Sequence, residues 1–435
     1  MSERINTPII DVLSSFTPKE IEGVLHSPQL STFIEEYSPF ESVMWADFSA
    51  TNPGELEELS FATQLASFYQ LKTAEKLQNN PENELLWVQR FNLASQELNG
   101  SIDPHEVTKI VAKELSVLEA GDPDSTVTKV YRHLLGGAKA ESAEVGSSDL
   151  LGVVREALMT RFSSIAEVIS TLPEGPYDSA TVRDVFQKIL SGMAEKDSDW
   201  SEWEITNTEG KTMLSVLSPK KKIDIPDGRG PVESKSQLMG LAFHEIGVHA
   251  LRAVNGYKTE DGLMAKGYPG YIDFEEGLGI LFEFLATGIV PDKTLDRYVD
   301  IALATGAVNG YTLSRAELIE LGVNREFVRA KARDQNAPDA VKIRGGIVAH
   351  VNRIFRGGTG QPILDQHTSI ISQPVFTKDL VYYEGLAKAR DFVETQIATG
   401  TSADALLDFL LSGKFDATNL DHVAYLASRH SVSIQ

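Results

Sequence analysis

The chain has 435 residues, of which 42% are hydrophobic and 23% are charged, a composition typical of a folded globular protein. Its formal net charge of −22 repels nucleic-acid phosphates and anionic membrane surfaces, so we expect neither as a partner. There is no cysteine, which excludes disulfides, thiolate metal sites and cysteine nucleophiles. A zinc or transition-metal site would therefore use only His, Asp and Glu side chains.

The first residues, MSERINTPIIDVLSSF, mix charged with apolar residues and lack a basic stretch followed by a long apolar one, so they do not indicate a secretory signal. The longest apolar stretch, from Leu278 to Val290, is interrupted by Glu283 and is too short to span a bilayer. We therefore expect a cytoplasmic protein.

Apolar residues recur at helical spacing from Thr17 to about Leu118, and helical patterns separated by turns continue to about Leu172. This pattern predicts a helical N-terminal region over residues 1–195. Between Trp203 and Asp227 the apolar residues form short alternating runs, which predict two or three antiparallel strands. The sequence therefore favours an α+β fold that is mainly helical and has a small antiparallel sheet.

A helix is predicted after Pro231, capped by Ser234 or Ser236 and ending at Asn255-Gly256. It carries the sequence His244-Glu-Ile-Gly-Val-His249, an HExxxH motif. Zinc peptidases commonly space these histidines by four residues, which places them about 40° apart on an α-helix, whereas a spacing of five places them about 140° apart. Two ligands of one metal would then require one residue to be looped out, so we predict a π-turn between the histidines, with Gly247 as the residue that tolerates it most easily.

A second predicted helix opens at Asp273-Phe-Glu-Glu-Gly-Leu-Gly279, with Asp273 as its N-cap. Glu276, which we prefer to Glu275, would join the two histidines as the third ligand of one zinc ion per chain and leave the fourth position open for water. Glu275 and Glu276 could alternatively serve only to complement the helix dipole. Glu283 faces the same side of this helix as Glu276 and is expected to be either a hydrogen-bond partner of a ligand histidine or part of a buried salt bridge.

Within this zinc site, Glu245 is the predicted general base, which takes the proton of the attacking water and delivers it to the leaving amine. A regulatory protein that keeps only a structural zinc would not need this carboxylate. The intact Glu245 therefore favours a hydrolase.

The sequence resembles the microtubule-associated tyrosine carboxypeptidases, whose bacterial members are called flavohemoglobin expression-modulating QEGLA-motif proteins. The resemblance covers roughly Trp203 to Val393 and is carried by the segments His244–His249, Glu275–Gly279, Arg353–Gly357 and Thr377–Tyr382, with Gly385. The second segment departs from QEGLA, since it has Glu275 for glutamine and Gly279 for alanine.

The resemblance implies a gluzincin-type zinc metallopeptidase whose catalytic domain spans residues 196–435 and whose third metal ligand is Glu276. It also implies carboxypeptidase action on the C-terminal tail of a peptide or protein, which in eukaryotic relatives removes tyrosine from acidic tails such as those of tubulin. We therefore expect loss of a C-terminal tyrosine or other aromatic residue. An aminopeptidase or endopeptidase on the same core, and a zinc-containing binding protein without catalysis, are the alternatives.

The matched C-terminal segments supply further candidates. Tyr382 is expected to donate a hydrogen bond to the oxyanion, with Tyr383 as its alternative. Arg353 or Arg356 would bind the substrate's free carboxylate, and Lys378 would add a charge. Alternative roles are ordinary ion pairs for the arginines and core packing for Tyr382.

Overall fold

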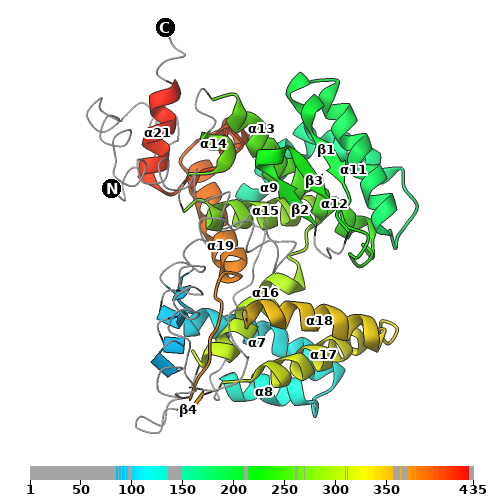
Figure 1. Cartoon of the computed structure of the whole chain (residues 1–435), viewed down its shortest axis with the longest axis vertical. Helices are drawn as coiled ribbons and strands as arrows, with labels where there is room; N and C mark the ends of the chain where they lie inside the picture. Colours follow the sequence, from blue (N-terminus) through cyan, green and yellow to red (C-terminus); the bar gives the residue numbers. More distant parts are fainter. Residues whose placement is uncertain are drawn as a thin grey trace. The chain divides into compact units, whose positions relative to one another are not determined.

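The structure is a computed structural model of the chain (Figure 1). It describes residues 85–86, 88–89, 91–93, 95–96, 100–135, 149–209, 214–259, 263–268, 270–308, 310, 312–355, 363–364 and 371–430. These residues are mainly helical and include a small sheet, which confirms the predicted α+β class. The helices predicted before residue 85 lie outside the described residues. Among the described helices, none combines the length and apolar character that crossing a membrane requires.

The chain divides into two compact units. Within the described residues, unit 1 comprises parts of 149–291 and 384–430, and unit 2 comprises parts of 85–135 and 292–383. The sequence-based boundary between residues 195 and 196 falls inside unit 1. It does not separate compact units, because the helices that precede it share one hydrophobic core with the sheet and the helices that follow.

Unit 1 is built largely from helices. They are α9 (Asp149–Arg161), α10 (Ser163–Ser170), α11 (Ser179–Ala194), η1 (Ser198–Glu202), α12 (Lys235–His244), η3 (Glu245–Ala250), α13 (Leu251–Tyr257), α14 (Leu263–Lys266), α15 (Ile272–Thr287), α20 (Ala403–Leu410) and α21 (Leu420–His430). Helix α19 (Leu380–Ala398) belongs to unit 1 from Glu384 onward.

Helices α12 and α15 pack along each other, and this contact positions the site described below (Figure 1). Phe162, at the end of α9, lies edge-on against Phe243 of α12 with the ring centres 5.6 Å apart. The same ring contacts Phe282 of α15 at 6.4 Å. One aromatic side chain therefore packs against both helices, and such edge-to-face pairs add to the stabilisation from apolar burial.

The sheet of unit 1 has three strands, β1 (Glu204–Thr206), β2 (Ser215–Leu217) and β3 (Lys222–Asp224), in the order β1-β3-β2. The prediction of a purely antiparallel sheet is wrong, because β1 pairs with β3 in parallel and only β2 pairs with β3 in antiparallel fashion. The short helix η2 (Ser218–Lys220), followed by Lys221 at φ 52°, reverses the chain tightly between β2 and β3. Strand β1 therefore adds to the other edge of β3.

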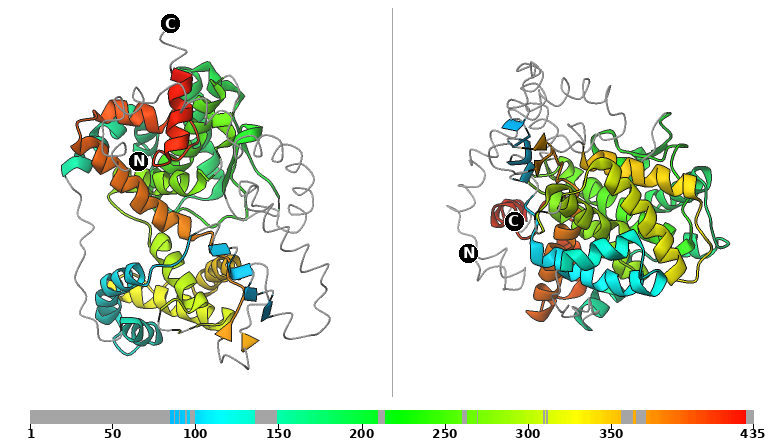
Figure 2. Two further views of the ribbon diagram at one scale, coloured as in Figure 1. Left: turned by 90° about the vertical axis from the view of Figure 1, so that its left-hand side faces the viewer. Right: turned by 90° about the horizontal axis from the view of Figure 1, so that it is seen from below.

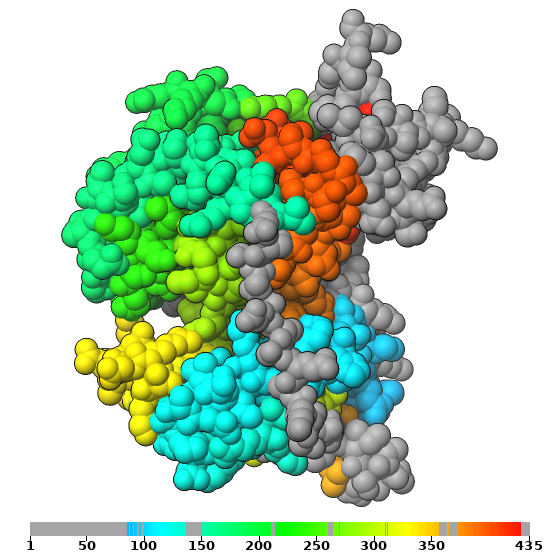
Figure 3. All heavy atoms as spheres, turned by 180° about the vertical axis from the view of Figure 1, so that it is seen from behind, coloured from blue at the N-terminus to red at the C-terminus, as the bar shows by residue number. Residues whose placement is uncertain are grey.

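Unit 2 is a second helical body with its own hydrophobic core. It contains α7 (Pro104–Gly121), α8 (Thr126–Leu135), α16 (Asp292–Thr305), α17 (Arg315–Ala332), α18 (Ala340–Ile354) and the two-stranded sheet of β4 (Ile363–Leu364) and β5 (Ile371–Ser372). Helix α7 packs against α8 and α17, and α17 against α18 (Figure 2). In Figure 3 the side chains of α7 and α8, drawn in cyan, form one continuous surface of this unit.

The helices α7 and α8 and the helical residues between 85 and 96 confirm part of the predicted helical N-terminal region. Inside unit 2, Arg325 is fully buried and forms two hydrogen bonds with Asp300, at 2.8 and 2.9 Å. Such a bidentate pair offsets the cost of burying both charges and links α17 to α16.

Candidate metal centre

The helix that carries the HExxxH motif has the predicted irregularity. Ser234 caps α12 by accepting a hydrogen bond from the backbone N–H of Gln237. Residues Glu245–Ala250 then form a π-helix, η3, before the α-helical pattern resumes at Leu251. The predicted π-turn between His244 and His249 is confirmed, because the wider turn accommodates the extra residue of the motif.

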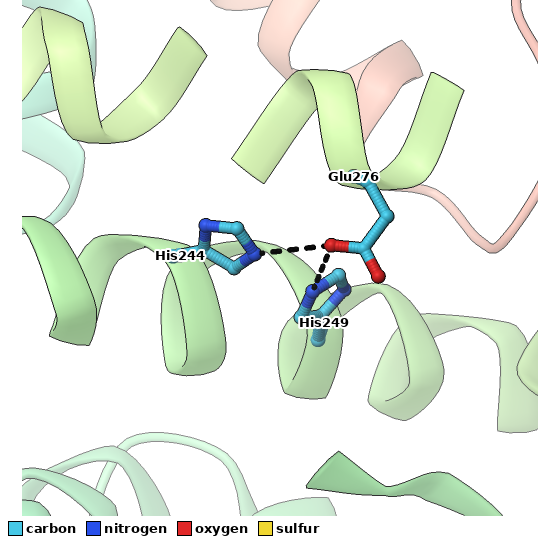
Figure 4. A group of neighbouring side chains, drawn as sticks. All are labelled: His244, His249 and Glu276. Carbon is cyan, nitrogen blue, oxygen red and sulfur yellow. Dashed lines mark ion pairs between the residues drawn. The ribbon is translucent and has the colours of Figure 1, made fainter. Parts of the chain in front are cut away.

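The two imidazoles lie close together as a result. Their ring centres are 4.7 Å apart, and both rings are almost fully buried. Figure 4 shows both side chains directed toward Glu276 on the neighbouring helix α15. The Nε2 atoms of His244 and His249 lie 3.5 and 3.6 Å from the same carboxylate oxygen, Oε2 of Glu276.

These distances fit a metal ion bound between the three side chains. One ligand atom from each of His244, His249 and Glu276 lies within 4.8 Å of the others. Tetrahedral zinc with bonds of about 2.1 Å requires ligand atoms about 3.4 Å apart, close to the separations of 3.5 and 3.6 Å between the Nε2 atoms and Oε2 of Glu276. Two imidazole nitrogens and one carboxylate are also a donor set that zinc accepts while retaining an open position.

Helix α15 begins at Ile272, with Tyr271 as its N-cap. The prediction that Asp273 caps this helix is wrong. The backbone N–H of Glu275 donates to the carbonyl of Tyr271, so the first helical hydrogen bond already encloses Asp273 in the first turn.

Each histidine is held from behind by a further carboxylate. Nδ1 of His244 lies 2.6 Å from Oε1 of Glu283, and Nδ1 of His249 lies 3.0 Å from Oε1 of Glu275. The expected contact between Glu283 and a histidine of the motif is confirmed. An Nδ1–H that donates to a carboxylate leaves the Nε2 lone pair available, and both Nε2 atoms face Glu276.

The electrostatics of the cluster favour a bound cation. Burial disfavours the protonated imidazole of His249, but hydrogen bonds to Glu275 and Glu276 outweigh it and raise the pKa of His249 to about 9. Burial also raises the pKa of Glu245, and the nearby carboxylates of Glu276 and Glu283 add to this effect. The surrounding carboxylates therefore favour a positive charge at this position, which a proton on His249 supplies without metal and which a bound divalent ion could supply instead.

Two glycines of α15 allow this helix to pack closely against α12 and α19. A Cβ atom on Gly279 would lie 2.7 Å from Cε1 and Nε2 of His244, so the ring occupies the space of a side chain. A Cβ atom on Gly277 would lie 1.9 Å from the carbonyl carbon of Gly385 in α19. The backbones of α15 and α19 are therefore in direct contact beside the turn that carries Glu276.

Several predicted substrate residues lie in unit 2, whereas the three candidate ligands and Glu245 lie in unit 1. Arg353 is buried and hydrogen-bonds to both carboxylate oxygens of Asp379, at 2.8 and 3.2 Å. Lys378 is also buried, and the ring of Tyr382 lies 4.1 Å from the guanidinium of Arg297. Neither unit by itself contains both these residues and the triad of candidate ligands, His244, His249 and Glu276.

Of the two remaining residues predicted from the sequence, Tyr383 and Arg356, the structure describes only Tyr383. The hydroxyl of Tyr383, the alternative to Tyr382, donates to Oε2 of Glu106 at 2.8 Å, within unit 2. Arg356 lies outside the described residues.

Three cationic residues of unit 1 were missed by the sequence reasoning: Arg229, Arg252 and Lys414. Arg252 and Lys414 both form ion pairs with Glu275. Arg252 follows His249 by three residues, a helical spacing that could have indicated a shared face. Lys414 is distant in sequence from the motif, so no local pattern indicates its place.

Arg229 is half-buried in the loop between β3 and α12. Its guanidinium donates to the carbonyl oxygen of Gly230 at 3.5 Å and forms no ion pair among the residues the structure describes. Burial lowers the pKa of Arg229, and the charge of Glu245 opposes that effect. A cation that interacts with the predicted general base is thus available to an anionic ligand.

The site lies within a segment that is similar to a known family. Residues 220–433 match the family model described as microtubule-associated tyrosine carboxypeptidase. The match includes the π-helix, Glu276 and the cationic residues around them. A comparison with curated proteins found no match to the chain.

Proposed function

The chain belongs, through residues 220–433, to the microtubule-associated tyrosine carboxypeptidase family, and from this premise we propose that it is a zinc-dependent carboxypeptidase. Its substrate is the C-terminal tail of a peptide or protein, from which it removes a tyrosine or other aromatic residue. The observation that carries the zinc proposal is the meeting of His244, His249 and Glu276 at ligand distance, from the end of α12, the π-helix and α15 respectively.

In the proposed reaction the metal and the side chains of the protein have different roles. Zinc, when bound, supplies Lewis acidity that activates water and polarises the scissile carbonyl. Glu245 accepts the proton of the attacking water and delivers it to the leaving amine. Its partly buried carboxylate holds a proton more firmly than a fully exposed one, which suits a group that must both accept and return it.

A carboxypeptidase must also recognise the free carboxylate of its substrate. We add Arg229 to the candidates Arg353, Arg356 and Lys378 for this role, because it lies in the same unit as the triad and interacts with Glu245. A guanidinium offers two parallel hydrogen bonds to a carboxylate, the geometry that C-terminal recognition uses. Arg353 already makes such a pair with Asp379, which supports Arg229 as the first residue to test.

The experiment incubates a library of peptides with varied C-terminal residues with the zinc-loaded wild-type protein and, in parallel, with Glu245→Gln. Mass spectrometry follows the peptide masses, and metal analysis confirms that both proteins contain zinc. The proposal expects loss of single C-terminal residues, aromatic ones first, with the wild type alone. Zinc-loaded wild type that leaves every peptide intact would instead favour a zinc-containing binding protein, and internal or N-terminal cleavage would favour an endopeptidase or aminopeptidase.

A further inference from the structure

The two carboxylates that hold the histidines have different surroundings. The side chain of Glu283 keeps 17% of its surface exposed, and its carboxylate pairs with His244. Glu275 is 3% exposed and contacts two cations in addition to His249. Nζ of Lys414 lies 3.2 Å from Oε1, and Nη1 of Arg252 donates to Oε2.

Both cations are themselves fixed by the backbone of unit 1. Nη2 of Arg252 donates to the carbonyl of Phe415 at 2.7 Å, and its guanidinium lies over the Phe415 ring. The backbone N–H of Lys414 donates to Met264 at 2.7 Å, and its carbonyl accepts from Tyr268 at 3.0 Å. The segment Lys414–Phe415 therefore holds the two charges in one place.

Glu275 cannot easily change its position in this environment. Its carboxylate receives donors on both oxygens, from His249 and Lys414 on Oε1 and from Arg252 on Oε2. Rotation about its terminal bond would break several of these charge-assisted hydrogen bonds. The acceptor presented to Nδ1 of His249 is therefore fixed in direction.

We propose that Glu275 is a positioning residue for His249, and that Arg252 and Lys414 fix its carboxylate so that the segment Lys414–Phe415 completes the metal centre. This inference rests on the proposal that the triad binds zinc. The ring of His249 is then oriented by residues that do not touch the metal, and its Nε2 faces Glu276 before the metal arrives. A carboxylate behind a ligand imidazole also makes that imidazole a stronger donor.

The test measures zinc affinity of the full-length chain by competition with a chromogenic chelator. Far-UV circular dichroism follows thermal unfolding of the same proteins without metal. The variants are Glu275→Gln and the double variant Glu275→Gln/Lys414→Gln. The control is Glu394→Gln, which removes one negative charge from an ion pair with Arg390 elsewhere in unit 1.

Glu275→Gln is expected to weaken zinc binding about 10- to 100-fold, the usual effect of losing a residue behind a metal ligand. It also lowers the melting temperature, because two buried cations lose their counter-charge. The double variant removes one of these cations, so its melting temperature recovers toward the wild type while its zinc affinity stays low. The control retains wild-type zinc affinity.

A double variant that folds and binds zinc as tightly as the wild type would overturn the proposal and leave Glu275 as a structural ion pair only. Because this variant restores the charge balance, the inference stays testable even where Glu275→Gln alone does not fold. Failure of the proposed metal site has a different signature, since the wild-type protein itself would then bind no zinc.

Discussion

Substituting Gly279 by alanine tests how tightly the structure fixes the ring of His244. The added Cβ would lie 2.7 Å from two atoms of the imidazole, and ordinary contact begins at 3.4 Å, so the ring must move by about 0.7 Å. Metal sites tolerate only about 0.2 Å of error in ligand distances. The ring cannot retreat freely, since its Nδ1 is held 2.6 Å from Glu283. Overpacking of this kind costs about 1–3 kcal/mol, so we expect zinc affinity to fall about 10- to 100-fold.

The assay is chelator competition for zinc, with thermal unfolding of the metal-free protein as a second measurement. Gly247→Ala is the matched control, because a Cβ there would meet its nearest neighbour, Phe162, at 3.9 Å, which is ordinary contact. The control should keep its zinc affinity and gain about 0.5–1 kcal/mol of stability, since alanine is the better helix former. Unchanged zinc affinity in Gly279→Ala would refute the reasoning, because the ring would then have room to move without leaving the metal.

Three further predictions concern other parts of the two units. Arg229→Gln should raise KM for peptides with a free C-terminus about 10- to 100-fold with a smaller change in kcat, and Arg229→Lys should recover only part of this loss. Steady-state kinetics tests this, and an unchanged KM in Arg229→Gln would remove the residue from the proposal. Burial and the carboxylate of Asp273 raise the pKa of Glu384 from 4.5 to about 8, so its contribution to stability is full below pH 4.5 and is lost as the pH rises toward 8. Glu384→Gln should therefore be more stable than the wild type at pH 8 by about 1 kcal/mol after solvent screening, and equal stabilities in urea unfolding at that pH would contradict this. Asp300→Asn deprives the buried Arg325 of its bidentate partner and should lower the free energy of unfolding by about 3 kcal/mol with unchanged zinc affinity. A melting temperature equal to that of the wild type would show that the remaining partners of Arg325 suffice to stabilise its charge.

Much of the metal centre could be predicted from the sequence because its geometry is local. The five-residue spacing of His244 and His249 is incompatible with shared ligation on a regular α-helix, so it required the π-turn that the structure contains. The positions of Glu276 and Glu283 on one face of α15 follow from helical periodicity in the same way. The sequence also suggested that the π-turn needs a residue without a Cβ atom at Gly247. The structure does not support this, since the π-helix leaves room there for a Cβ.

The sheet shows where local patterns stop being informative. Alternating apolar residues indicate strands, but the direction of β1 depends on which edge of β3 is free after the turn at Lys221. The same limit applies to the start of α15, which is fixed by the carbonyl of Tyr271 rather than by the side chain of Asp273.

The sequence by itself determined the irregular helix and identified the candidate ligands, and it led to the proposal of Glu245 as the general base, because these follow from residue chemistry and from periodicity within one helix. Only the tertiary structure decided which residues from distant segments contact the turn that carries Glu275 and Glu276. Lys414 reaches Glu275, and Gly385 reaches the turn of Glu276, from segments more than a hundred residues away along the chain. Such contacts depend on how α15, α19 and the C-terminal segment pack together, and packing between distant segments leaves no periodic signal in the sequence.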